Sequence, residues 1–254
     1  MMRSRPILAF RILLLATCLA AVAVTAVAGV FLVALARRLP GLLAAEELSR
    51  AQRRRWLIFL VVFGIAFPCA VAMLRGGLHG ISQAYERTTY EFIGDIGKAP
   101  SIPDLFTNYL KVRPYLSMHA KVHPPGPIAF LWLLSYVVTQ DPLALSFATI
   151  VVAALAIVPL YFWARELLGE RGAIASSAIY VCVPSVVLFN ATSADALFPV
   201  VTLSCLLCFE RALRAPTLAR GAGYAAAAGL GFFLMTILKF SLVGMGVYFA
   251  LAGL

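Results

Sequence analysis

Two carboxylates in the polar segment of residues 85–127 have a spacing that could support catalysis. Glu91 and Asp95 stand four residues apart in the sequence YEFIGDI. Within a helix, this spacing places both side chains on one face. One carboxylate could then act as a general base while the other holds a metal ion or a substrate. Arg87 precedes Glu91 by four residues, so the same pattern also fits an exposed ladder of ion pairs, and spacing alone leaves both interpretations open.

Two histidines follow in the sequence MHAKVHPPGP. Proline restricts the residue before it to extended geometry, so we expect His123 at a fixed corner and not inside a helix. An imidazole held in this way can orient a phosphate or a hydroxyl. His119 and His123 also have the spacing of two zinc ligands on a helix. The proline breaks such a helix and no HExxH glutamate lies between them, which makes zinc the less favoured interpretation.

Asp195, in the sequence FNATSADALF, is a third candidate acid. It stands where an apolar helix is expected to begin, so an ordinary helix start beside Ser193 explains it as well as a functional role does. An ionisable residue at a membrane boundary is nonetheless a functional candidate, here with Glu91 or Asp95 as companions across a cleft.

Cationic side chains accompany these groups in the polar segment. They could bind an anionic head group or a pyrophosphate, or they could simply be solvated. The cations in question are Lys98, Lys111, Arg113 and Lys121.

The rest of the chain is apolar. Hydrophobic residues make up 62% of the whole chain and charged residues only 13%, with a mean hydropathy of +0.93. Such a chain has too little polar surface to cover a water-soluble globule of 254 residues. We therefore expect an all-α fold, a polytopic bundle of transmembrane helices. The net charge of +10 does not indicate a nucleic-acid partner, because the arginines form short clusters between apolar runs.

The apolar runs predict about seven spans, since a helix needs roughly 20 apolar residues to cross the hydrocarbon. The predicted spans are residues 12–36, 56–74, 143–164, 173–189, 196–209, 222–238 and 240–254. The run 127–138 is too short, so we expect a juxtamembrane helix at the outer interface, within an outer loop of residues 75–142. The last run ends in mid-helix, which favours a chain that is incomplete at its C-terminus.

The arginines orient this bundle. Six of them between the first two predicted spans indicate a cytoplasmic linker and put the 75–142 loop outside, although the orientation of the first helix stays open. If the 127–138 helix does not span, the later basic linkers are cytoplasmic too, and residues 190–195 reach the outer face. We thus expect a multi-pass protein of the plasma (inner) membrane whose active face is extracytoplasmic.

These residues and their topology resemble a known group of enzymes. An acidic residue after an outward-crossing helix, an aromatic-rich outer loop, and HPPG before a short apolar helix resemble the GT-C glycosyltransferase superfamily. The resemblance is to the protein O-mannosyltransferases and the aminoarabinose lipid A transferases. It covers roughly residues 55–214, and HPPG in this topology is its most specific part. Residues 190–195 are similar to the second acidic site of the superfamily.

The resemblance implies a membrane glycosyltransferase that moves a sugar from a polyprenyl-phosphate donor to an unspecified acceptor on the outer face. By position, Glu91 or Asp95 would be the catalytic base, and the adjacent acidic pair usual in the family is not matched closely enough to choose between them. Together with the cations and histidines described above, this gives the predicted substrate-binding residues, which are Arg113, His119, Lys121, His123, Asn190 and Asp195. The resemblance leaves the cofactor and the metal requirement open, and a divalent metal would fit with Asp95 and Asp195 as its ligands.

Two other functions compete with this one. The alternative is a non-catalytic, truncated relative that binds lipid phosphate or scaffolds partners. A transporter is the least favoured of the three functions. It would need polar residues at mid-membrane, and the predicted spans are nearly free of them.

Overall fold

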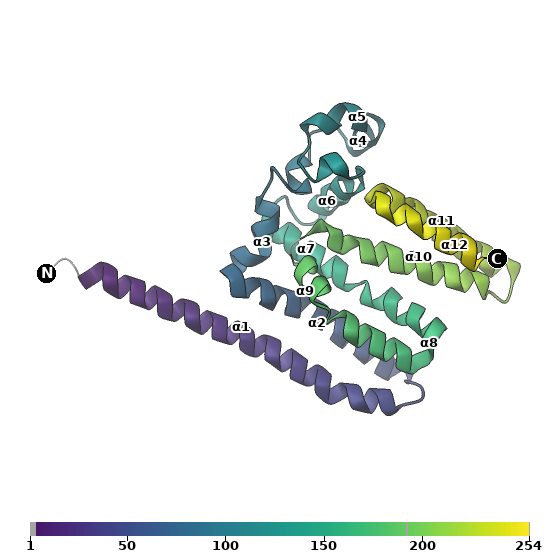
Figure 1. Cartoon of the computed structure of the whole chain (residues 1–254), viewed down its shortest axis with the longest axis horizontal. Coiled ribbons are helices and arrows are strands. Elements are labelled where there is room, and N and C mark those ends of the chain that lie inside the picture. Colours follow the sequence, from purple (N-terminus) through teal and green to yellow (C-terminus); the bar gives the residue numbers. More distant parts are fainter. Residues whose placement is uncertain (1–3, 192, 254) are drawn as a thin grey trace.

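The chain folds into helices. The computed structural model describes residues 4–191 and 193–253, and every regular element within them is an α-helix or a 3-10 helix (Figure 1). In chain order the elements are α1 (Ser4–Ala44), α2 (Arg50–Gly76), α3 (Leu78–Glu86), η1 (Phe92–Asp95), α4 (Ile102–Thr107), α5 (Tyr109–Val112), η2 (Arg113–Tyr115), η3 (Ala120–Val122), α6 (Gly126–Val137), α7 (Pro142–Ala154), α8 (Ile157–Tyr180), α9 (Pro184–Asn190), η4 (Ala194–Leu197), α10 (Phe198–Leu213), α11 (Leu218–Leu238), η5 (Phe240–Gly244) and α12 (Met245–Ala252). The predicted all-α class is confirmed.

Five helical segments among the described residues are long and apolar enough to cross a membrane. They are Val22–Ala44, Arg50–Leu74, Pro142–Tyr180, Ala194–Leu213 and Leu218–Leu238. The polytopic bundle is therefore confirmed, but the predicted number of seven spans is not.

The difference in number has two sources. The predicted spans 143–164 and 173–189 share one apolar segment, Pro142–Tyr180. The predicted span 240–254 corresponds to the shorter apolar helix Phe240–Ala252, and residue 254 lies outside the described residues.

The long segment Pro142–Tyr180 reverses direction at Gly169. This glycine has φ 71° and ψ −174°, in the left-handed region that favours glycine. Tyr161 and Glu170 would lie about 13.5 Å apart along a straight helix, yet the Tyr161 hydroxyl donates a hydrogen bond to the Glu170 carboxylate. The second half of α8 therefore runs back along the first, as its green colour after the teal half shows in Figure 1.

The turns gather at two opposite ends of the bundle. At one end, Arg53 of α2 forms an ion pair of 3.1 Å with Glu170, and Arg211 of α10 one of 3.4 Å with Glu166. We call this the arginine end. At the other end lie residues 77–141, together with the α9–η4 connection and the end of α11 (Figure 1). We call this the loop end.

The loop end has its own hydrophobic core, which fixes the polar segment in place. Phe92 of η1, Leu105 of α4, Ile128 of α6 and Leu145 of α7 belong to one buried cluster. Helix α6 coincides with the predicted 127–138 helix, and at 1.5 Å per residue it is too short for the roughly 30 Å hydrocarbon core.

A close backbone contact joins α6 to the end of α11. The HPPG sequence ends at Gly126, where an added Cβ would lie 2.3 Å from the carbonyl oxygen of Ile237. A side chain at this position would therefore push α6 and α11 apart.

We expect Gly126→Ala to destabilise the protein for that reason. Overpacking costs about 1–3 kcal/mol, which corresponds to a fall in Tm of roughly 2–12 °C. The measurement is thermal unfolding of the purified chain in detergent. The matched control is Gly244→Ala, where an added Cβ meets nothing within 4 Å. Equal Tm values for the two variants would contradict the close contact.

Candidate active site

Glu91 lies at the loop end, with its side chain largely buried. Its backbone is extended (φ −102°, ψ 152°) and precedes η1. The side chain is 12% exposed, and its Oε1 lies 3.4 Å from Nδ1 of His119. Burial raises the pKa of the Glu91 carboxyl; His119 opposes this rise, and the negative charge of Asp195 adds to it. The charge of Asp195, far away in the sequence, thus contributes to the electrostatic environment of Glu91.

Asp95 has a different environment. Its carboxylate is fully buried and accepts hydrogen bonds from Lys98 Nζ at 2.8 Å, from the Ser117 amide at 2.8 Å and from the Ser117 hydroxyl at 2.6 Å. These donors tie η1 to the segment before His119. The carboxylate is therefore placed to hold the loop together and has little surface left for a ligand.

The predicted helix face shared by Glu91 and Asp95 is wrong. Helix α3 ends at Glu86, Arg87 caps it, and η1 is a single 3-10 turn that begins after Glu91. The chain turns so tightly here that a Cβ on Gly94 would lie 2.1 Å from the carbonyl oxygen of Thr88. Neither the shared face nor the exposed α-helical ladder can form with this backbone.

His119 reaches Glu91 because two backbone hydrogen bonds hold their segments together. The Met118 amide donates to the Thr89 carbonyl and the His119 amide to the Tyr90 carbonyl, both at 3.1 Å. The imidazole of His119 is thus fixed beside the carboxylate of Glu91.

His123 has the extended backbone that its following proline predicts, with φ −114° and ψ 161°. Its Nδ1 donates to the His119 carbonyl at 2.9 Å, and its ring meets the Phe92 ring edge-on at 5.5 Å. The Tyr109 hydroxyl bonds the carbonyl oxygens of Ala120, at 2.7 Å, and His123. His123 therefore sits at a fixed corner, as expected.

Asp195 forms an ion pair with a residue that sequence reasoning missed. The Ser193 hydroxyl accepts from the Asp195 amide at 3.1 Å and caps η4, which leaves the Asp195 carboxylate free for Lys239. The Asp195 Oδ2 and Lys239 Nζ atoms are 2.9 Å apart, and Nζ also lies 5.0 Å from the centre of the Phe198 ring. A lone lysine between two apolar runs was the signal for Lys239, but only the fold supplies its partner.

A groove of about 650 Å³ opens beside this ion pair. One part of its lining is polar, with Asn190, Asp195, Lys239 and Ser241. The rest is mainly apolar and comes chiefly from α9, α10 and η5: Tyr180, Val186, Phe189, Phe198, Pro199, Leu203 and Leu242. A molecule with an anionic head and a hydrocarbon tail would match both parts.

A small polar cavity of about 10 Å³ lies close by, with Tyr85, Ser146, Thr149 and Asn190 in its lining. The Tyr85 hydroxyl and Thr149 Oγ1 are 3.0 Å apart, and the buried Ser146 hydroxyl has no protein partner among the described residues. Burial raises the pKa of Tyr85, and the charges of Glu91 and Asp195 add to the rise. This space is close to the minimum for one water molecule.

The cations of the polar segment make other contacts. Arg113 Nε donates to the Lys121 carbonyl at 2.7 Å, Lys111 bonds the Asn108 side chain at 3.3 Å, and Lys98 bonds Asp95. The Lys121 side chain is exposed. The structure thus gives Arg113 and Lys121 no direct contact with the Glu91 and Asp195 carboxylates.

The two candidate metal ligands have separate partners, Lys98 and Ser117 for Asp95 and Lys239 for Asp195. Across residues 4–191 and 193–253, no group of three or more His, Cys, Asp or Glu side chains is placed to hold a metal ion. The two aspartates therefore do not form a joint metal site in this arrangement.

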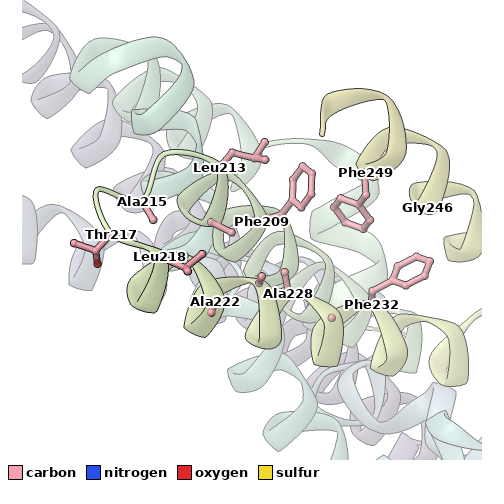
Figure 2. A pocket seen from close by; sticks show the side chains of 14 residues that line it. Phe209, Leu213, Ala215, Thr217, Leu218, Ala222, Ala228, Phe232, Gly246 and Phe249 are labelled. Carbon is pink, nitrogen blue, oxygen red and sulfur yellow. The ribbon is translucent and has the colours of Figure 1, made fainter. Parts of the chain in front are cut away.

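Another groove, of about 730 Å³, is a different feature nearer the arginine end. Figure 2 shows the rings of Phe209, Phe232 and Phe249 at one end of it and Thr217 at the other. None of its lining residues is titratable. It offers no group for chemistry.

Comparison with known proteins identifies one family. The family described as dolichyl-phosphate-mannose-protein mannosyltransferase matches residues 122–253, just over half of the chain. The match includes His123, Asp195 and Lys239, whereas Glu91 and Asp95 precede it. No curated protein and no solved structure matches the chain.

The different surroundings of the two acids predict different effects on stability. Asp95→Ala leaves buried donors on Ser117 unpaired, at about 1–3 kcal/mol each, so we expect a Tm several degrees lower. Glu91→Gln should leave Tm within about a degree of the native value, because burial already disfavours the ionised Glu91 carboxylate. Thermal unfolding of both variants in detergent checks this, and an equal loss in both would contradict the structural role of Asp95.

Proposed function

The chain belongs to the dolichyl-phosphate-mannose-protein mannosyltransferase family, and from this membership we propose that it transfers a sugar from a polyprenyl-phosphate donor to an acceptor outside the cytoplasm. The family makes it a membrane glycosyltransferase of the GT-C type. The observation that carries the finer proposal is the amphiphilic groove lined by the Asp195–Lys239 ion pair, and the charge of Asp195 also contributes to the raised pKa of Glu91.

The distribution of arginines supports the proposed side of the membrane. Arginines in the α1–α2, mid-α8 and α10–α11 turns all belong to the arginine end, and basic residues mark cytoplasmic turns. The loop end, with Glu91 and Asp195, then faces away from the cytoplasm. In a bacterial-type envelope this is the outer face of the plasma (inner) membrane.

The groove beside Lys239 suits the donor lipid. Its apolar lining would shelter the prenyl chain, and the ammonium of Lys239 would contact the phosphate. Asp195 keeps this ammonium in place through their 2.9 Å ion pair. Asn190, which is buried and lines the same groove, would contact the sugar or the phosphate.

Glu91 is the better placed of the two proposed bases. Asp95 is enclosed by its own donors, whereas Glu91 is partly exposed and has a raised pKa. In the transfer step the Glu91 carboxylate would take the proton of the acceptor hydroxyl. At the same time, the oxygen of that hydroxyl would form a bond to the anomeric carbon. The bond from that carbon to the phosphate oxygen breaks, and polyprenyl phosphate leaves with the electron pair, facing Lys239.

The histidines would position this base. His119 contacts Glu91 directly, and His123 holds the corner that precedes α6. Arg113 and Lys121 lie at more exposed positions of the polar segment, and their proposed role is contact with the substrate from the aqueous side.

Glu91→Gln tests the proposed base. We expect transfer to fall by about 10²–10⁴-fold, the usual contribution of a general base. The assay follows label from polyprenyl-phosphate mannose into lipid-free or protein-bound products, in membranes that contain the full chain. Membranes without the chain give the baseline. Glu86→Gln, at the exposed end of α3, is the matched control and should keep native activity.

Donor binding is measured in parallel with the same labelled lipid. Glu91→Gln should still bind the donor, because its carboxylate does not line the groove. Full transfer activity in Glu91→Gln would overturn the assignment of the base. Donor binding by the native chain without any transfer would instead support the non-catalytic alternative, a binder of lipid phosphate.

The acid limb of the pH profile gives a second test. A base must be ionised, and the raised pKa of Glu91 means that activity should be lost on acidification at a pH above the ordinary value of about 4.3. Asp195→Asn removes a neighbouring negative charge and should move this limb to lower pH. His119→Gln removes a group that lowers the pKa of Glu91 and should move the limb to higher pH. Shifts in the same direction would contradict the proposed electrostatics.

A further inference from the structure

We propose that the chain holds an anionic phospholipid in a groove between α1 and α2 at the arginine end. The groove has a volume of about 680 Å³, within the roughly 300–1,000 Å³ of ligand pockets. It lies at the opposite end of the bundle from Glu91 and Asp195, and it does not depend on the proposed transfer reaction.

The walls of this groove are amphiphilic. Leu42, Ile58 and Val62 supply aliphatic surface, and Trp56 and Phe59 supply aromatic surface. The Trp56 and Phe59 rings stack at 5.8 Å. The polar residues, Arg38, Gln52 and Arg55, line the same groove. A phospholipid whose acyl chain lies along the apolar wall would place its head-group phosphate beside the guanidinium groups of Arg38 and Arg55.

Arg38 is held over this wall. Its guanidinium carbon lies 4.4 Å from the centre of the Phe59 ring, a cation–π contact. Both Arg38 and Arg55 are exposed, and neither belongs to an ion pair among the described residues. A guanidinium presents several donors in a plane, which suits the oxygens of a phosphate.

Most of the arginines around the groove have no ion-pair partner among the described residues. Helix α2 begins with Arg50, and its first turn has no acidic residue, although the positive end of a helix dipole favours acids there. Of the arginines in this region, Arg53 is neutralised by Glu170. Glu46 and Glu47 in the connecting turn are exposed and join no ion pair among the described residues. A lipid phosphate would supply the missing negative charge.

A phospholipid fits this groove better than a soluble anion because the groove combines charge with a long apolar wall in a membrane segment. Basic pockets between transmembrane helices are typical sites for anionic lipid head groups. The chemistry of the ligand is therefore a glycerophospholipid with a net negative head group, in the leaflet next to the arginine end.

Native mass spectrometry of the purified full chain tests the charge requirement. The chain is incubated with micelles of equal phosphatidylglycerol and phosphatidylcholine content, and the retained lipids are counted. We expect the native chain to prefer phosphatidylglycerol, and Arg38→Gln with Arg55→Gln to reduce this preference about tenfold or more, since each arginine contributes roughly fivefold. The matched control, Arg50→Gln with Arg54→Gln, should keep at least about half of the native preference, because neither residue lines the groove. An equal loss in both pairs would show a general basic surface and overturn the site.

A second pair of variants tests the groove without changing any charge. Gly41 lines the groove, and an added Cβ there meets nothing within 4 Å, so Gly41→Leu should fill the space without disturbing the fold. Gly29→Leu is the matched control on the same helix, at a glycine with equally open surroundings but outside the groove. We expect Gly41→Leu to lose phosphatidylglycerol and Gly29→Leu to retain it. Unchanged retention in Gly41→Leu would overturn the proposal.

Soluble glycerol phosphate separates a lipid site from a site for free phosphate. It should fail to displace phosphatidylglycerol at millimolar concentration, because it lacks the acyl chains that contact the apolar wall. Complete displacement would show that the groove binds the phosphate group alone and would overturn the lipid assignment.

Discussion

The loop end depends on one buried carboxylate, that of Asp95. A fully buried charge is strongly unfavourable unless it is paired and hydrogen-bonded, and Asp95 has Lys98 and two donors of Ser117. These contacts tie η1 to the segment before His119. The tie keeps Thr89 and Tyr90 beside Met118 and His119, which leaves Glu91 facing its histidine. A residue that is poorly placed for catalysis thus determines where the proposed base lies.

The membrane imposes a second constraint, because charges are costly in the hydrocarbon and gather at its two faces. Both ends of the bundle have a groove where apolar walls meet cations. At the loop end the cation, Lys239, is paired with Asp195, whose negative charge also raises the pKa of Glu91. At the arginine end, neither Arg38 nor Arg55 forms an ion pair with an acid in the described part of the chain. Paired opposite charges suit a site where protons and leaving groups move, whereas unpaired positive charge suits a site that only holds an anion.

Composition and local sequence predicted the fold class, the short helix α6 and the extended backbone of His123, because these depend on hydropathy and on the residue that follows. They did not predict the backbone between Glu91 and Asp95, where a helix with both side chains on one face was expected. The 3-10 turn found there depends on a close approach of Gly94 to Thr88. The predicted number of spans was not confirmed, partly because two predicted spans fall in one apolar segment, Pro142–Tyr180, on either side of its reversal at Gly169. Lys239 was missed because its partner, Asp195, is 44 positions away.

The ion pair between Asp195 and Lys239 also couples the two halves of the proposed reaction. In the unliganded protein the lysine offsets part of the negative charge that Asp195 exerts on Glu91. A donor phosphate that takes hydrogen bonds from Lys239 brings its own negative charge and shares the lysine with Asp195. The negative potential at Glu91 then increases, and a carboxylate under a more negative potential has a higher affinity for protons. The donor would therefore make Glu91 a stronger base at the stage when an acceptor hydroxyl must lose its proton.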